Sequence, residues 1–367
     1  MQKTIQEGKA KIYVPEGKIT KKLSVFYNPD MELNRSISVA LLNSVKNKNM
    51  QIGLPLAASG IRGIRFLNEL KKNKVKKVYF NDHNPKFFEI LEKNFAMNKL
   101  SKGKITVSNM DANVFLENSM GFDYIDIDPF GSPNVFLENS IKRLSRDGIL
   151  AVTATDTGCL SGSFQNACKR KYFAKPLKNE LMHETGLRIL IRKIQLIGMQ
   201  HEKSLVPVFS YSLLHYMRVF FVCKKGKKKC DELLKKHKYL VYCNKCMNFF
   251  LSDYNCGECC DKKMLYGGPL WIGELFDKKL CDKMLKNCKE KEINGFLETI
   301  CGEAKIDKPF FYDLHRIGKI HKVDIPRING LIKKLRKNKY KAERTHFSKY
   351  GIKTNIEFNK FLKLIKE

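Results

Sequence analysis

Apolar residues in the first 225 positions form short runs, and between these runs they recur every three to four positions. Short apolar or alternating runs that end in turns predict buried strands, whereas the recurrence predicts helices. Strands that alternate with helices predict a parallel doubly wound sheet, and therefore a Rossmann-like α/β fold. The predicted strands are 52–58, 76–80, 105–109, 123–127 and 148–155, with helices at 31–47 and 85–98.

The pattern changes after position 155. A long helical stretch at 178–195 precedes two apolar segments, 205–213 and 216–223, which we expect to be adjacent antiparallel strands at the end of the sheet. A parallel sheet that ends in such a hairpin is typical of class I methyltransferases and not of dehydrogenases. Residues 1–24 predict a short, basic, β-leaning segment with a turn at 15–17.

A lysine-rich run at 224–230 predicts a domain boundary, which divides the chain into 1–224 and 225–367. In the second part, 267–271 predicts a turn closed by the only tryptophan. The segments 307–320 and 326–338 predict helices, and 344–354 predicts two strands joined by a turn. Helix, helix and hairpin are similar to a winged helix, so we expect a smaller α+β domain.

Charge narrows the range of partners. The chain has 367 residues, a formal net charge of +32 and a pI near 9.6. This excess favours a polyanionic partner, although a lysine-rich composition can also reflect genome bias. A membrane surface is a weaker alternative, because no apolar run reaches transmembrane length and the N-terminus lacks the apolar core of a signal peptide. We expect a cytoplasmic, soluble protein with no obligate protein partner.

The C-terminal segment concentrates this charge. From position 331 onward, 12 basic residues face 3 acidic ones, a net of 12 − 3 = +9. Tyr340, His346, Phe347 and Tyr350 are interleaved with the lysines and arginines. A solvated basic face is the simpler interpretation, but the aromatic residues favour a nucleic-acid surface.

The stretch F-D-Y-I-D-I-D-P-F-G at 122–131 predicts a strand that is broken in one step. Proline cannot donate to a strand ladder and glycine permits unusual backbone angles, so the chain must turn there. The turn leaves the carboxylate of Asp128, the carbonyl of Pro129 and the ring of Phe130 together at a strand end, where α/β sheets bind ligands. Carboxylate and ring together suit chemistry on an exocyclic amine; a plain Asp-Pro turn is the alternative.

A glycine-containing turn follows the first predicted strand, at 59–65. Position 58 is alanine, so the full G-x-G-x-x-G pattern is absent and the turn alone is a weak dinucleotide signal. Asp82, however, ends the next strand 22 residues after Gly60 (82 − 60), where an acid that binds ribose hydroxyls is expected. Four predicted strands end in an acid at the same edge: Asp82, Asp111, Asp128 and Asp156.

Twelve cysteines in an intracellular protein indicate metal ligands or buried thiols. Cys243 and Cys246 form one C-x-x-C pair, and Cys256 and Cys259 form a second pair nine residues later. Two such pairs predict one tetrahedral zinc site, with residues 248–253 as a small hairpin between them. Four reduced structural cysteines are the alternative, and Cys260 competes with its neighbours as a ligand.

Several motifs together carry a family resemblance that covers nearly the whole chain. The motifs are F-Y-N-P-x-M-x-x-N-R at 26–35, A-S-G-I-R-G-I-R at 58–65, D-I-D-P-F-G-S-P at 126–133, T-A-T-D at 153–156, H-E-x-G-L-R-I-L at 183–190, S-Y-S-x-x-H-Y-x-R-V at 210–219, G-P-L-W at 268–271 and R-T-H-F with G-I-K-T at 344–354. With these motifs the chain resembles the tRNA guanine-N2 dimethyltransferase family in its archaeal form. One departure is Phe173, where the family usually has glycine after Tyr172.

The resemblance implies methyl transfer from S-adenosylmethionine to the exocyclic N2 of guanosine 26 in tRNA, once or twice. It implies that Arg35 and Arg65 face the methionine end of the cofactor, that Asp82 holds the ribose, and that Asp111 and Ala112 hold the adenine. It also implies a base pocket of Phe26, Asp128 and Phe130, to which the Pro129 carbonyl adds a second acceptor. On the residues alone, Phe26 could equally be a core anchor and Arg35 an exposed helix charge.

Three other functions stay open. A DNA amine methyltransferase shares the sheet, but D-P-F-G is not its usual D/N-P-P-Y/F motif. An NAD-dependent dehydrogenase would need the missing glycine pattern and gives no reason for the zinc site. A non-catalytic RNA-binding protein is disfavoured by the intact Asp82, Asp111 and Asp128.

Overall fold

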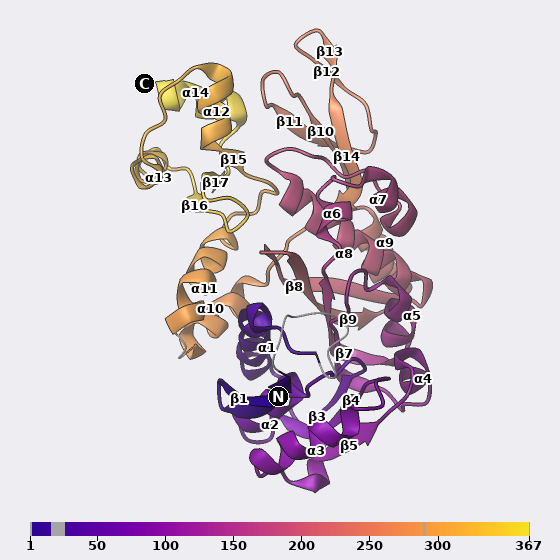
Figure 1. Ribbon diagram of the computed structural model, residues 1–367. Coiled ribbons are helices and arrows are strands. Elements are labelled where there is room, and N and C mark those ends of the chain that lie inside the picture. Colours follow the sequence, from indigo (N-terminus) through magenta and orange to yellow (C-terminus); the bar gives the residue numbers. More distant parts are fainter. Residues whose placement is uncertain (1, 16–25, 289–290, 367) are drawn as a thin grey trace.

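A seven-stranded sheet organises the N-terminal half of the molecule (Figure 1). The computed structural model describes residues 2–15, 26–288 and 291–366. The strand order is β5-β4-β3-β6-β7-β9-β8, parallel from β5 to β7 and antiparallel from β7 to β8. The predicted doubly wound sheet with a terminal hairpin is confirmed. Its strands are β3 (Met50–Leu54), β4 (Val75–Asn81), β5 (Ile105–Ser108), β6 (Phe122–Ile127), β7 (Leu144–Ala154), β8 (Lys203–Leu213) and β9 (Tyr216–Lys225).

The apolar runs of the sequence become the core of this sheet. Ile52, Val78, Ile125 and Val152 come from four adjacent strands, and all are fully buried. Burial of one such side chain stabilises the fold by roughly 1.5–3 kcal/mol. The helices that connect the strands are α1 (Glu32–Ser44), α2 (Ile61–Glu69), α3 (Phe87–Met97), α4 (Ala112–Glu117), α5 (Asn134–Arg143), α6 (Thr157–Leu160), α7 (Gln165–Tyr172) and α8 (Met182–Gln200).

An N-terminal hairpin packs against the outer helices. Strands β1 (Gln2–Glu7) and β2 (Ala10–Pro15) pair antiparallel, as the β-leaning pattern predicted. Ala10, Ile12 and Val14 pack on Ile61 and Ile64 of α2. The predicted turn at 15–17 lies largely outside the described residues.

A second, three-stranded sheet extends the molecule at the end opposite β5 (Figure 1). It consists of β10 (His237–Tyr242), β11 (Phe249–Ser252) and β14 (Leu265–Trp271), in the order β11-β10-β14. Two predictions are wrong here. Residues 267–271 form the end of strand β14 and not a turn, because they pair with β10, and Gly267 leaves room for Thr185 of α8. Residues 248–253 contribute β11, which pairs with β10, and do not form a hairpin of their own.

The C-terminal elements gather at one end of the molecule (Figure 1). Helix, helix and hairpin are confirmed from residue 314 onward. The predicted helix start at 307 is wrong, since Pro309 disfavours helical geometry in the residue before it and 312–313 join a sheet of order β15-β17-β16. The elements are β15 (Tyr312–Asp313), α12 (Leu314–His321), α13 (Ile328–Lys337), β16 (Ala342–Arg344), β17 (Gly351–Thr354) and α14 (Phe358–Lys366).

Helices α10 (Lys278–Asn287) and α11 (Lys291–Glu303) join these elements to the large sheet. Helix α10 packs against α1, and Asn287 donates a hydrogen bond to Ser44 at 3.4 Å. On the other side, the Ser212 N–H of β8 donates to His346 Nε2 at 3.4 Å. The two halves are therefore fastened to each other at two places.

The lysine run at 224–230 does not form a linker. Strand β9 ends within it, and helix α9 (Lys227–Leu234) begins within it and packs on β8. The division at 224/225 stays a prediction. None of the helices in the described ranges is both long and apolar enough to cross a membrane.

Candidate functional site

A cavity of about 980 Å³ opens at the carboxyl ends of β3, β4 and β6. Its wall combines residues from far apart in the chain, as expected where parallel strands converge. Eight of the nine predicted base-pocket and cofactor residues of the first half line it; Arg65 does not. Those eight are Phe26, Arg35, Asp82, Asp111, Ala112, Asp128, Pro129 and Phe130.

The turn after β3 shapes one wall. Gly60 has a φ of +77°, and a Cβ at this position would lie 2.3 Å from Leu91, so glycine is required for both conformation and space. The Ala58 N–H donates to Asp82 Oδ2 at 2.9 Å, and the Asn84 N–H donates to Asp82 Oδ1 at 3.1 Å. These two bonds fix the Asp82 carboxylate beside the turn.

The next wall is the start of α4. Asp111 caps this helix, because its Oδ1 accepts from the N–H groups of Asn113 and Val114 at 2.8 and 3.3 Å. The carboxylate stays exposed on the cavity wall, beside the buried Ala112. The fourth strand-end acid, Asp156, instead accepts hydrogen bonds from Tyr172 and Lys171 and does not line the cavity.

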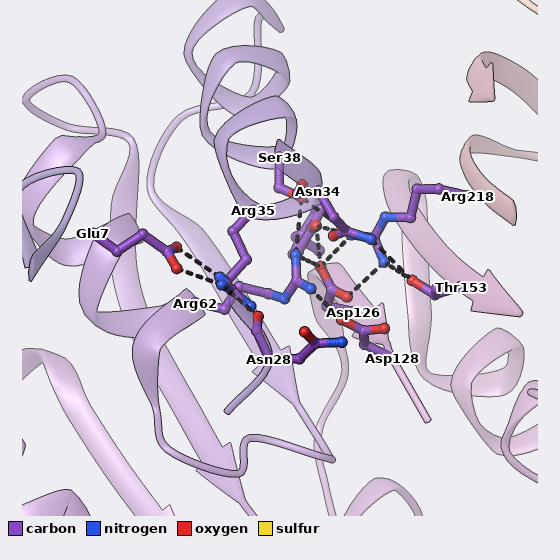
Figure 2. Close-up of polar contacts among 11 residues, drawn as sticks. Glu7, Asn28, Asn34, Arg35, Ser38, Arg62, Asp126, Asp128, Thr153 and Arg218 are labelled. Carbon is purple, nitrogen blue, oxygen red and sulfur yellow. Dashed lines mark hydrogen bonds and ion pairs between the residues drawn. The ribbon is translucent and has the colours of Figure 1, made fainter. Parts of the chain in front are cut away.

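Arg35 and Arg65 share one buried carboxylate. Glu7 of the N-terminal hairpin accepts from Arg35 Nε at 2.6 Å and from Arg65 Nη1 at 3.0 Å (Figure 2 shows the Arg35 pair). Burial alone would raise the pKa of Glu7, but the two guanidinium groups outweigh it and hold the pKa below its usual value. Arg65 is fully buried and also pairs with Glu69 at 2.8 Å, so it supports the wall from behind.

A polar network fixes Asp128 in the cavity (Figure 2). Arg62 donates from Nη2 to Asp128 Oδ2 and from Nη1 to Ser38 Oγ at 3.0 Å. Its Nη1 also lies 3.4 Å from Asp126 Oδ2. The Arg62 guanidinium thus sits between a buried carboxylate and a half-buried one.

Behind Arg62, Asp126 and Arg218 form a buried bidentate pair with N–O distances of 2.9 and 2.7 Å. Arg218 Nη1 also donates to Thr153 Oγ1 at 2.8 Å. Burial would raise the pKa of Asp126, and the charges of Arg218 and Arg62 outweigh that effect and lower it. Asp126 is therefore ionised, and it anchors the arginine that holds Asp128.

The D-P-F-G turn is fastened to the neighbouring strand. Gly131 N–H donates to Thr155 Oγ1 at 2.6 Å, and Thr155 N–H donates to the Gly131 carbonyl at 3.0 Å. Gly131 has a φ of +80°, which explains why glycine stands there. The Phe26 and Phe130 rings touch edge to face, with centroids 4.3 Å apart. A base can stack on one ring in this arrangement, and the rings must separate to clamp it.

Sequence reasoning missed several residues of the cavity wall. Arg62 belongs to the A-S-G-I-R-G-I-R motif, in which the resemblance indicates the second arginine, Arg65, as the cofactor residue. The segment 214–216, in the turn between β8 and β9, also lines the cavity, as does Asn28. His215 and Tyr216 belong to the quoted S-Y-S-x-x-H-Y motif, which could have indicated them.

Four cysteines lie together near the tip of the second sheet: Cys243, Cys246, Cys259 and Cys260. Their sulfur atoms are all within 4.8 Å of one another, and Cys246 and Cys259 are 3.6 Å apart. Sulfurs around a tetrahedral zinc with Zn–S bonds of about 2.3 Å lie roughly 3.8 Å apart, so this cluster could hold zinc. Cys256, the predicted fourth ligand, is exposed and outside the cluster, and Cys260 takes its place.

The aromatic residues of the C-terminal segment do not form one surface. Phe347 is buried, and His346 lies beneath the surface against Glu303 of α11, with Nδ1 and Oε1 2.6 Å apart. Tyr340 is half-buried, whereas Tyr350 is 45% exposed. Of the four rings, Tyr350 is the one placed to meet a partner.

Comparisons with known proteins agree with this geometry. The family model described as N2,N2-dimethylguanosine tRNA methyltransferase matches residues 8–366. The tRNA (guanine(26)-N(2))-dimethyltransferase of Methanobrevibacter smithii is 39% identical, with 99% of this chain and 97% of that protein aligned. The tRNA (guanine(26)-N(2)/guanine(27)-N(2))-dimethyltransferase of Aquifex aeolicus is 38% identical over 99% and 95%. The solved structure of Trm1 from Pyrococcus horikoshii with S-adenosyl-L-methionine has a TM-score of 0.89 at 37% identity, covering 99% of this chain and 100% of that one.

Proposed function

The chain belongs to the N2,N2-dimethylguanosine tRNA methyltransferase family, and from this premise we infer that it is an S-adenosylmethionine-dependent tRNA (guanine26-N2)-dimethyltransferase. It transfers one or two methyl groups to the exocyclic N2 of guanosine 26. The observation that supports this most directly is the cavity in which Asp82, Asp111 and Asp128 meet at the strand ends. As an enzyme of tRNA, it acts in the cytoplasm.

The residues of the cavity fit the methyl donor. Asp82, fixed by two backbone N–H groups, accepts from the ribose hydroxyls, and Asp111 accepts from the adenine amine beside Ala112. Arg35 faces the methionine carboxylate. Arg65 contributes through Glu7, which it shares with Arg35. When bound, S-adenosylmethionine supplies an electrophilic methyl group on a sulfonium.

Asp128 prepares the acceptor. Guanine N2 is a poor nucleophile because its lone pair is delocalised into the ring. The Asp128 carboxylate and the Pro129 carbonyl accept its two hydrogens, which turns the nitrogen toward a tetrahedral shape and localises the lone pair. As the N–C bond forms and the C–S bond breaks, the electron pair stays on sulfur and the surplus proton of N2 passes to Asp128. Positioning and fixed charges supply most of such a rate enhancement.

Guanosine 26 must leave the tRNA core to reach this cavity, so the enzyme extrudes its target base. Phe130, 47% exposed at the rim, and Phe26 receive the ring. The basic second domain, 225–367, holds the phosphates, and zinc on the cysteine cluster stabilises the tip of the second sheet.

The test is nucleoside analysis of tRNA incubated with the protein and labelled methyl donor. We expect N2-methyl- and N2,N2-dimethylguanosine from wild-type tRNA and neither from tRNA with adenosine at position 26. Asp128→Ala should lower turnover at least about 10²-fold, the scale of losing a general base. Binding of tRNA without methylation would favour the non-catalytic RNA-binding alternative.

A further inference from the structure

A second cavity lies in the C-terminal elements, between α12, the start of α13 and the loop that precedes β17. Its volume is about 730 Å³, which is ample for a nucleoside. Leu314, Ile325 and Ile328 give it an apolar floor. Its mouth, in contrast to this apolar floor, carries two aromatic rings and two lysines.

Two exposed rings stack on each other at this mouth. His315 and Tyr350 have ring centroids 5.3 Å apart and an interplanar angle of 27°. Both residues are exposed, and Tyr350 keeps 45% of its surface in solvent. Aromatic side chains in a folded protein usually bury their faces, so a stacked pair in solvent presents surface for a flat partner.

The backbone holds Tyr350 in place. The Leu314 N–H donates to the Tyr350 carbonyl at 3.0 Å, and the Tyr350 N–H donates to Ser348 Oγ at 3.2 Å. Ser348 in turn donates to Asp313 Oδ2 at 2.8 Å. The backbone that carries the ring is therefore already ordered before a ligand stacks on it, and this lowers the entropic cost of binding.

Lysines complete the site. Lys319 and Lys349 line the cavity, and Lys349 Nζ lies 4.9 Å from the Tyr350 ring centroid. Within the described ranges neither ammonium group has a carboxylate within ion-pair distance. Two acids belong to the segments that form the cavity: Asp324, and Asp313, which is buried and accepts from Ser348.

We propose that this His315–Tyr350 pocket stacks an unpaired base of the tRNA, away from the methylated guanosine, while Lys319 and Lys349 contact the flanking phosphates. The proposal rests on the proposed function for the identity of the RNA. A flat aromatic platform with cations at its rim matches how proteins bind unpaired nucleotides, and the unpaired bases of a tRNA lie in its loops. The net charge of +32 favours the same class of partner.

The test compares Tyr350→Ala, Tyr350→Phe and Tyr254→Ala in the full chain, with an in vitro transcribed tRNA as the probe. Tyr254 is 73% exposed and lies outside the pocket, so it controls for the loss of any exposed ring. Tyr350→Ala should raise the Kd for tRNA about 5- to 150-fold, the scale of one lost base–aromatic stack. Tyr350→Phe and Tyr254→Ala should bind like wild type.

The salt dependence of tRNA affinity distinguishes the contribution of the lysines from that of base stacking. Lys319→Ala and Lys349→Ala should each reduce the slope of log affinity against log salt by about 1, whereas Tyr350→Ala should leave the slope unchanged. Affinity for S-adenosylmethionine should be unchanged in all variants, and Tyr350→Ala should raise KM for tRNA more than it lowers kcat.

The outcomes also separate this proposal from the proposed function. If the wild type methylates guanosine 26 and Tyr350→Ala binds tRNA with an unchanged Kd, the base-stacking proposal is wrong and the proposed function stands. The two rings would then be candidates for contact with a protein partner. An equal loss in Tyr254→Ala would overturn it too, since any exposed ring would then matter. Absence of methylation by wild type would overturn the proposed function, while the Kd series would still decide the pocket.

Discussion

Replacing Arg62 with methionine tests whether the position of Asp128 limits the reaction. Methionine keeps most of the side-chain length and removes the guanidinium. Asp128 loses the ion pair at Oδ2, while Asp126 keeps both hydrogen bonds from Arg218. The fold should survive, because the buried carboxylate stays paired and the Asp128 side chain is still 21% exposed to water.

The magnitude follows from one charge-assisted hydrogen bond. Such a bond contributes roughly 1.5–3 kcal/mol, and each 1.36 kcal/mol in the barrier changes the rate about tenfold. Arg62→Met should therefore lower the single-turnover rate at saturating tRNA and methyl donor by about 10- to 150-fold. Arg62→Lys, which keeps a charge but not the fork geometry, should recover part of this loss.

The assay is rapid-quench methyl transfer alongside calorimetric binding of S-adenosylmethionine. Arg143→Met is the matched control. This arginine is the last residue of α5, donates a hydrogen bond to the Glu117 carbonyl and lies outside the cavity. In a double-mutant cycle, Arg62→Met added to Asp128→Asn should cause little further loss, because both changes remove the same interaction. If Arg62→Met instead weakens binding of the methyl donor and leaves the saturated rate unchanged, Arg62 serves the donor and the reasoning is refuted.

Three further predictions concern the metal, pH and the backbone. Cys260→Ser should lose the zinc measured by mass spectrometry and Cys256→Ser should retain it, because Cys260 lies in the sulfur cluster. The opposite result would show that Cys256 is the fourth ligand, as the C-x-x-C spacing predicted. Burial lowers the pKa of His237 to about 4. As the pH falls below 6.5, this histidine is therefore protonated in the unfolded chain before it is protonated in the folded one. The free energy of unfolding should drop by about 2–3 kcal/mol between pH 6.5 and pH 4. Urea titrations should show this drop abolished in His237→Gln and retained in His83→Gln, and an unchanged drop in the first variant would contradict it. Phe173 has a φ of +52° and a largely exposed ring, so Phe173→Gly should raise the unfolding free energy by up to about 1 kcal/mol, whereas Phe173→Ala should give no gain in the same titration.

The acids of the cavity could be predicted from the sequence because geometry brings the ends of parallel strands together. Asp82, Asp111 and Asp128 each follow a recognisable strand, and all three line the same cavity in the structure. The family prediction is confirmed by the comparisons, because the family model matches residues 8–366.

What could not be predicted depends on contacts between distant segments. Arg62 and Arg65 are three residues apart on one helix, and their different roles follow from Glu7, which an N-terminal hairpin brings under α2. The burial of His346 depends in the same way on Glu303, 43 residues earlier. At the cysteines, the backbone conformation determines which thiol joins the cluster. Cys260 and Asp261 both have positive φ, and this turn places Cys260 beside Cys243, Cys246 and Cys259.

The fastening of α10 to α1, and of His346 to Ser212, bears on how one guanosine is chosen among many. Because the two halves are joined at both places, the distance between the His315–Tyr350 pocket and Asp128 should vary little. If both proposed sites bind one tRNA, a tRNA with a base in the His315–Tyr350 pocket can present to Asp128 only the nucleotide at that distance. On this proposal, the target guanosine would be selected by its position in the folded RNA, without contacts to the bases next to it.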